Sequence, residues 1–133
     1  MKNEESIEKL QRGLNMPKPH HNLEVWKRSL NYVTKVYEIT AKYPDEEKFG
    51  LVSQMRRAAV SVPANIAEGF KRMGIAEKMR FHNIAEASLE ELKYFVILST
   101  DLGYLANGQT ILERAETVSK MLYGLIQSTK RRK

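Results

Sequence analysis

Residues 49–70 read FGLVSQMRRAAVSVPANIAEGF, and this stretch decides the fold. Apolar and small residues recur in it every three or four positions, which predicts a helix with one continuous buried face. We expect this helix to follow an N-cap at Asp45 and to end near Lys71. Pro63 removes an amide donor, but the apolar period continues to Phe70, so we expect a bend there rather than an end. The predicted buried face comprises Leu51, Met55, Ala58, Val62, Ile66 and Gly69.

The preceding segment predicts another helix, from about Leu23 to Tyr43, which Pro44 ends. Its apolar residues form two stripes with helical spacing, so we expect more than one packing neighbour, inside the bundle or in another subunit. One stripe comprises Leu23, Trp26, Leu30, Val33 and Tyr37, and the other comprises Val25, Tyr32, Val36 and Ile39.

Two further helices are predicted downstream. The third runs from about Ile75 to Leu102 and is stopped by Gly103, and the fourth follows an N-cap at Asn107. Four amphipathic helices with short connections indicate an all-α fold, an up-and-down antiparallel four-helix bundle with a kinked second helix. The expected buried faces are Phe81, Ile84, Ser88, Leu92, Phe95 and Leu102 in the third helix, and Ile111, Ala115, Val118, Leu122 and Leu125 in the fourth.

The length of 133 residues fits one domain. We divide it into a flexible or short-helical N-terminal lead at 1–21, the bundle at 22–129 and a basic tail at 130–133. The chain has no cysteine, which excludes a disulfide framework, a thiolate nucleophile and zinc or iron–sulfur sites built on sulfur. Neither a secretory signal nor a membrane-spanning apolar stretch is found, so we expect a cytoplasmic protein with no membrane partner.

The net charge of +6 comes from 22 basic and 16 acidic residues, and it is unevenly distributed. The last four residues, 130–133, are all basic, and without them the chain carries only +2. A basic tail can contact phosphates. It can equally be a solubilising helix end that complements the helix dipole.

Catalytic constellations are missing from the sequence. There is no phosphate-cradling glycine loop, nucleophile elbow or His-Glu-x-x-His pair. His82 and Glu86 are one turn apart and could supply at most two metal ligands, so a surface ion pair is the preferred interpretation. Glu86, Glu90 and the adjacent Glu91 are interpreted as a solvated or interface-pairing acidic face, with Lys93 next to Glu90. We therefore expect no catalytic residue, no metal and no cofactor.

Basic pairs are the strongest candidates for a functional site. Adjacent helical residues point about 100° apart, so one member of Arg56-Arg57 must lean toward the apolar seam. We interpret that guanidinium as bonded to a carboxylate such as Glu68 or Glu90, within the bundle or across subunits, in preference to a phosphate contact. The candidate nucleic-acid-binding residues, which would act together if they share one rim, are Lys27, Arg28, Lys71, Arg72, Lys130, Arg131, Arg132 and Lys133.

The stretch at 49–69 closely resembles the signature of the four-helix-bundle proteins encoded in 23S rRNA intervening sequences. Residues 23–26 (LEVW) resemble the motif with which that family begins, and residues 80–81, 84–85 and 88–92 resemble its third helix. The resemblance implies a bundle that assembles as a homopentamer and supplies no catalytic residue. It also implies kinship in fold with accessory variability determinants, the basic pentameric partners of reverse transcriptases in diversity-generating retroelements. The polar signature of the second helix, interpreted as bundle and interface architecture, is Arg56, Arg57, Asn65 and Glu68.

The leading hypothesis is a non-enzymatic homo-oligomer that binds RNA or DNA through repeated basic surfaces, since five copies would carry about +30. One alternative is an accessory subunit of a reverse transcriptase, which the acidic stretch of the third helix would contact. Another is a purely structural, protein-binding oligomer in which the charge serves only solubility.

Overall fold

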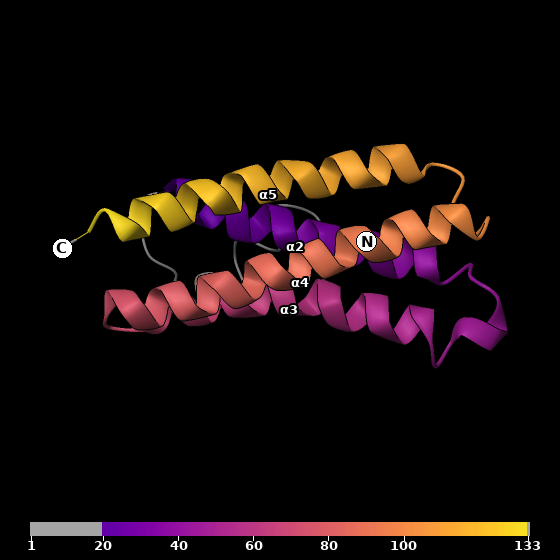
Figure 1. Ribbon diagram of the computed structural model, residues 1–133, viewed down its shortest axis with the longest axis horizontal. Helices are drawn as coiled ribbons and strands as arrows, with labels where there is room; N and C mark the ends of the chain where they lie inside the picture. The colour runs from indigo at the N-terminus through magenta and orange to yellow at the C-terminus, as the bar shows by residue number, and fades with distance from the viewer. Residues whose placement is uncertain (1–19, 133) are drawn as a thin grey trace.

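The computed structural model describes residues 20–132, which form four α-helices and one short 3-10 helix (Figure 1). The elements are α2 (His20–Thr40), η2 (Asp45–Glu47), α3 (Leu51–Lys71), α4 (Ile75–Asp101) and α5 (Gly108–Lys130). Within these residues there is no strand, and none of the helices is long and apolar enough to cross a membrane. The predicted lead at 1–21, except its last two residues, and Lys133 lie outside the described residues.

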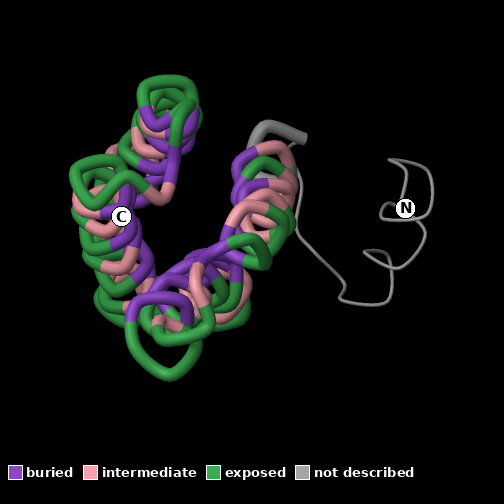
Figure 2. The backbone as a smooth tube through the Cα atoms, turned by 90° about the vertical axis from the view of Figure 1, so that its right-hand side faces the viewer, coloured by how far each residue is buried: buried purple, intermediate pink, exposed green. Residues whose placement is uncertain are grey.

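The four helices surround one core and run up and down in chain order (Figure 1). Helix α3 packs against α2 and α4, and α5 packs against α4 and α2. The pairs α2–α4 and α3–α5 are diagonal, and among the described residues their backbones do not approach each other closely. Buried residues face the inside of the arrangement, and exposed residues face outward (Figure 2). The predicted four-helix bundle is confirmed.

Helix α3 presents the buried face that its sequence predicts. Leu51, Met55, Ala58, Val62, Ile66 and Gly69 are all buried, and the helix continues through Pro63. The predicted N-cap was wrong, because Asp45 belongs to η2 and α3 begins only after Gly50. The chain first makes a short 3-10 turn, whose three acidic residues are all at least partly exposed.

Helix α2 differs from its prediction at its end and on its faces. It ends at Thr40, three residues short of Tyr43, and the Thr40 hydroxyl donates to the Val36 carbonyl at 2.7 Å. Of the two predicted stripes, the one containing Val25, Tyr32 and Val36 lies in the core. The other leaves the core at its end, where the Tyr37 side chain is 43% exposed.

The predicted buried face of α4 was wrong. Of its six members only Leu92 is buried, while Ile84 and Leu102 are exposed. Apolar residues occur on every side of this helix, so periodicity alone does not identify the inward side. The residues that α4 buries are His82, Ala85, Leu89, Leu92, Val96 and Ser99.

Helix α5 buries the face predicted for it, and a left-handed turn precedes it. Gly103 has a φ of 83°, a conformation that favours glycine, and it ends the segment after α4. Asn107 occupies the predicted N-cap position, but its side chain makes no capping hydrogen bond. The buried residues of α5 include Ile111, Ala115, Val118, Leu122 and Leu125.

Candidate nucleic-acid interface

The α3–α4 turn and the C-terminus of α5 lie at the same end of the bundle (Figure 1). Residues 68–80 and 129–132 contain seven basic side chains and two carboxylates. We call this region the basic end. Arg132 is close enough to Lys78 and His82 to act on both electrostatically, which joins the end of α5 to the start of α4. The basic side chains are Lys71, Arg72, Lys78, Arg80, Lys130, Arg131 and Arg132.

The opposite end of the bundle has the reverse charge. Residues 41–50 and 101–108 contain four carboxylates and two lysines, and we call this region the acidic end. Its carboxylates are Asp45, Glu46, Glu47 and Asp101. The bundle is therefore electrically polar along its axis.

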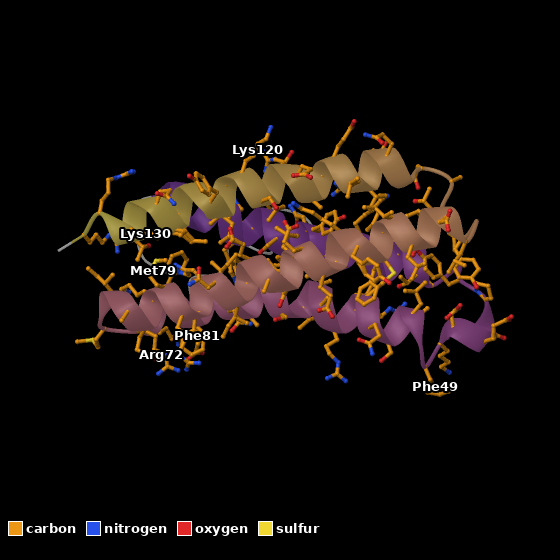
Figure 3. All side chains as sticks on the ribbon, in the orientation of Figure 1. Phe49, Arg72, Met79, Phe81, Lys120 and Lys130 are labelled. Atoms are coloured by element: carbon orange, nitrogen blue, oxygen red, sulfur yellow. The ribbon has the colours of Figure 1, made fainter. Side chains whose placement is uncertain are left out.

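At the basic end, two guanidinium groups lie over one phenylalanine ring. Arg72 is 4.7 Å and Arg80 is 4.5 Å from the centroid of Phe81 (Figure 3). Arg72 also forms an ion pair with Glu68, and Arg80 forms one with Glu77 at 3.5 Å. These contacts hold both guanidinium groups at the surface, where cation–π interactions fix their positions.

Lys78 has a structural role at this end. Its ammonium donates to the carbonyls of Gly69 (3.4 Å) and Phe70 (3.2 Å), in the last turn of α3. A cation there satisfies carbonyls that have no partner within the helix. Burial lowers the pKa of Lys78, and the neighbouring Arg132 lowers it further.

Four further cations at the basic end are exposed. Lys71, Lys130, Arg131 and Arg132 form no ion pair with any residue that the structure describes. Lys130 is the last residue of α5, so the predicted tail begins inside a helix. The Arg131 and Arg132 amides continue the turn, bonding the carbonyls of Gln127 and Thr129 at 3.2 Å each.

The predicted pair Lys27-Arg28 lies away from the basic end. Arg28 forms an ion pair with Glu24 at 3.1 Å and lines a small groove of about 120 Å³ beside Thr117. Thr117 precedes Lys130 by thirteen residues, about 20 Å of helix. The structure therefore brings together the α3 and α5 candidates but not the α2 pair. Lys78 and Arg80 were not among the predicted residues. They could have been predicted, because residues that follow a tight turn between two helices lie at the same end of the bundle as those that precede it.

Arg56 is the member of its pair that leans inward, but the prediction that it pairs with a carboxylate inside the bundle was wrong. Its guanidinium donates to the Thr40 hydroxyl (2.9 Å) and the Tyr37 carbonyl (3.3 Å), and it lies 4.4 Å from the Tyr37 ring centroid. Arg56 thus caps the C-terminus of α2. Glu68 instead pairs with Arg72, and Arg57 is exposed.

Asn65 belongs to a hydrogen-bonded chain between α3 and α4. Its amide donates to the Ser61 carbonyl at 2.8 Å and to the Ser61 hydroxyl at 3.0 Å, and that hydroxyl lies 2.8 Å from the Ser88 hydroxyl. The polar signature of α3 therefore acts within the subunit at Arg56, Asn65 and Glu68.

His82 was predicted to form a surface ion pair, and this was wrong. Its side chain is 1% exposed, and neither ring nitrogen has a hydrogen-bond partner among the described residues. The ring packs edge-on against Phe70, and a Cβ atom on Gly69 would approach its Nε2 to 2.5 Å. Burial lowers the pKa of His82 to about 4, and the nearby Lys78 and Arg132 contribute to this shift. His82 is thus a neutral packing residue.

Comparisons with known proteins agree with this architecture. Residues 21–124 match the model of the family described as 23S rRNA-intervening sequence protein. The chain belongs to this family. It is also similar to a crystal structure from Bacteroides thetaiotaomicron, described as a protein with unknown function from the S23 ribosomal protein family. That likeness has a TM-score of 0.74 at 23% identity, over 80% of this chain and 98% of the other, so it shows the fold alone. No curated protein matches the chain.

Neither the family nor the neighbour is described by a reaction. Among residues 20–132 no three metal-ligating side chains cluster. The Lys93 ammonium forms ion pairs with Glu90 at 2.8 Å and with Glu116 on α5 at 3.2 Å. Burial is the largest single effect on the pKa of Lys93 and lowers it, but the hydrogen bonds and charges of Glu90 and Glu116 together outweigh burial and raise the pKa.

Proposed function

We propose that this chain is a cytoplasmic, non-enzymatic homo-oligomer, a pentamer by its resemblance, that binds the phosphate backbone of RNA or DNA. The observation that carries the proposal is the basic end, where α3 and α5 present exposed cations that form no ion pair within residues 20–132. Lys71, Lys130, Arg131 and Arg132 are the primary phosphate contacts, with Arg72 and Lys133 assisting. Lys27 and Arg28 form a secondary contact along the side of the bundle. Such contacts supply affinity rather than sequence choice.

Oligomerisation strengthens this function. A single subunit with a net charge of +6 binds a polyanion only weakly. A pentamer carries about +30 and binds it more strongly. If the subunits share one orientation, their basic ends form a single charged face that contacts several phosphates at once.

The test is fluorescence anisotropy with an RNA hairpin and a DNA duplex over a potassium chloride series. The variant Lys71→Gln/Lys130→Gln removes two exposed lysines from the basic end. The control Lys42→Gln/Lys120→Gln removes two exposed lysines elsewhere (Lys120 is labelled in Figure 3). We expect the first variant to bind at least about tenfold more weakly at low salt, and to reduce the slope of log affinity against log salt by about 2 for the duplex. The control is expected to stay within about twofold of wild type.

Two results would overturn the proposal. One is wild-type affinity that is absent or independent of salt. The other is an equal loss of affinity in both double variants, which would indicate a response to net charge rather than to the basic end.

A second candidate is a protein-binding role, such as an accessory subunit of a reverse transcriptase. The observation that favours a protein partner is the exposed face of α4, where Tyr94 and Ile97 accompany Glu91 and Asp101. A purely structural oligomer would form without any affinity for RNA or DNA, so the binding series distinguishes it from the proposed function.

A further inference from the structure

A basic groove lies on the outer side of α2 and α3. It has a volume of about 750 Å³, and its apolar lining is exposed in part: Phe49 is 90% and Val60 43% exposed. Phe49 points away from the bundle at the acidic end (Figure 3). The charged lining residues are Lys48, Arg56 and Arg57. Exposed apolar side chains beside cations are typical of a surface that another macromolecule covers.

Helix α4 has an exposed face of the opposite charge. Tyr94 is 59% and Ile97 is 56% exposed, and both lie on the side of α4 that points away from the core. Glu91 and Asp101 are exposed on the same side. We call these four residues the α4 face.

The charged groups of the two surfaces are not neutralised within the subunit. Lys48 and Arg57 form no ion pair with a described residue, and neither do Glu91 and Asp101. Arg56, in contrast, is engaged with Tyr37 and Thr40. Groove and α4 face are therefore complementary in charge, and both contain exposed apolar groups.

The two surfaces lie at the same height along the bundle. The Ser61–Ser88 hydrogen bond (2.8 Å) and the Ser99–Met55 contact (3.5 Å) set α3 against α4 in register. Groove residues 53–61 consequently lie level with residues 88–101 of α4. Since α4 and α2 are diagonal in the bundle, the groove and the α4 face point to different sides, and one copy cannot join its own two surfaces.

We infer that the α4 face of one copy docks into the α2–α3 groove of the next copy. Two different patches in contact form a heterologous interface, which closes into a ring when the rotation between copies allows it. Because the patches are level, a rotation axis parallel to the helices brings them together, and every basic end then points to the same side of the ring. This inference rests on the homo-oligomer of the proposed function and assigns its interface.

The test is the mass in solution of the full chain, measured by light scattering during size-exclusion chromatography across a dilution series. Arg57→Glu and Glu91→Arg each place like charges across the interface, and the double variant restores an opposite pair. We expect each single variant to weaken association by about tenfold or more and the double variant to recover most of it. Arg114→Glu, an exposed change of equal charge on α5, is the control and is expected to keep the wild-type mass. Circular dichroism melting checks that all variants fold.

The outcomes separate this inference from the proposed function. Single variants with wild-type mass, or a double variant as weak as both singles combined, would overturn the interface and leave the nucleic-acid proposal intact. A monomeric wild type would overturn the interface and the oligomer together, while the anisotropy series still decides nucleic-acid binding. Groove variants that keep their mass but lose RNA affinity would assign the groove to nucleic acid instead.

Discussion

The two ends of the bundle carry opposite net charge, yet at each end a cation binds the C-terminus of a helix. At the acidic end Arg56 of α3 binds the last turn of α2, and at the basic end Lys78 of α4 binds the last turn of α3. In each case a cation from the following helix donates hydrogen bonds to the last turn of the preceding one. Arg56 bonds the Tyr37 carbonyl and the Thr40 hydroxyl, whereas Lys78 bonds two carbonyls and does so beside a further cation, Arg132.

The ends also differ in what remains available for a partner. At the acidic end Glu47 is occupied, because it accepts hydrogen bonds from the Tyr104 hydroxyl at 2.8 Å and from the Leu51 amide at 3.4 Å. At the basic end Lys71 and Lys130 are exposed and have no ion pair among the described residues. Four exposed cations without an ion pair among the described residues thus lie at the basic end, next to the buried and neutral His82. The basic end therefore carries most of its charge on exposed side chains and buries a neutral one, His82.

Acidification is expected to damage the basic end most. The pKa of His82 is lowered to about 4, below the ordinary value of 6.5, so the unfolded chain binds a proton that the folded chain refuses. Stability from this residue is complete above pH 6.5 and is lost as the pH falls toward 4. The expected loss at pH 4 is about 2 to 3 kcal/mol. Urea unfolding of wild type and His82→Met at pH 7, 5.5 and 4 measures this loss. Titration of carboxylates lowers the free energy of unfolding of both proteins, whereas only wild type should show the further loss due to His82. Equal pH dependence in both would contradict the prediction.

The next largest effect compares a glycine at each end. Gly69→Ala places a methyl group against the buried His82 ring, and we expect a loss of about 2 kcal/mol. Gly108→Ala at the acidic end places one against the Thr100 hydroxyl and within 3.1 Å of the Thr100 Cβ atom, and rotation of Thr100 would break the bond from its hydroxyl to the Val96 carbonyl, so we expect a similar loss of about 2 kcal/mol. Thermal melting of both variants measures the two losses. An unchanged melting temperature in either variant would contradict the close helix packing at that glycine.

The sequence predicts much of this architecture, and its largest failure, the buried face of α4, has a physical cause. In α3 and α5 the apolar residues form a single stripe, and the predicted faces are the buried ones. In α4 they occur all round, so the pattern pointed to Phe81 and Phe95 while the structure buries His82 and Val96. The apolar residues of α4 left exposed include Tyr94 and Ile97 of the α4 face, besides Ile84 and Leu102. A bundle helix whose apolar residues occur on all sides therefore indicates a second contact surface.

The candidate site was predictable in part for a different reason. The basic residues of α3 and α5 can be read from charge alone, and the up-and-down topology then places them at one end. The partner of Arg56 could not be predicted, because it depends on α2 ending at Thr40 rather than at Tyr43. The burial of His82 depends on Gly69 facing it across the α3–α4 interface, a contact between residues thirteen positions apart.

The smallest expected effect tests the two capping cations directly. Arg56→Met removes two hydrogen bonds and a stacked guanidinium, and we expect it to destabilise the bundle by about 1.5 kcal/mol. Lys78→Met also removes two hydrogen bonds, but it relieves the repulsion by Arg132 and the burial of a charge, so we expect about 0.5 kcal/mol or less. Chemical unfolding in low and high salt distinguishes the two causes. Added salt should stabilise wild type more than Lys78→Met, since screening relieves a repulsion that only wild type retains. If both substitutions cost the same in every buffer, the surroundings of the two caps do not matter, and the electrical difference between the ends would be confined to the surface.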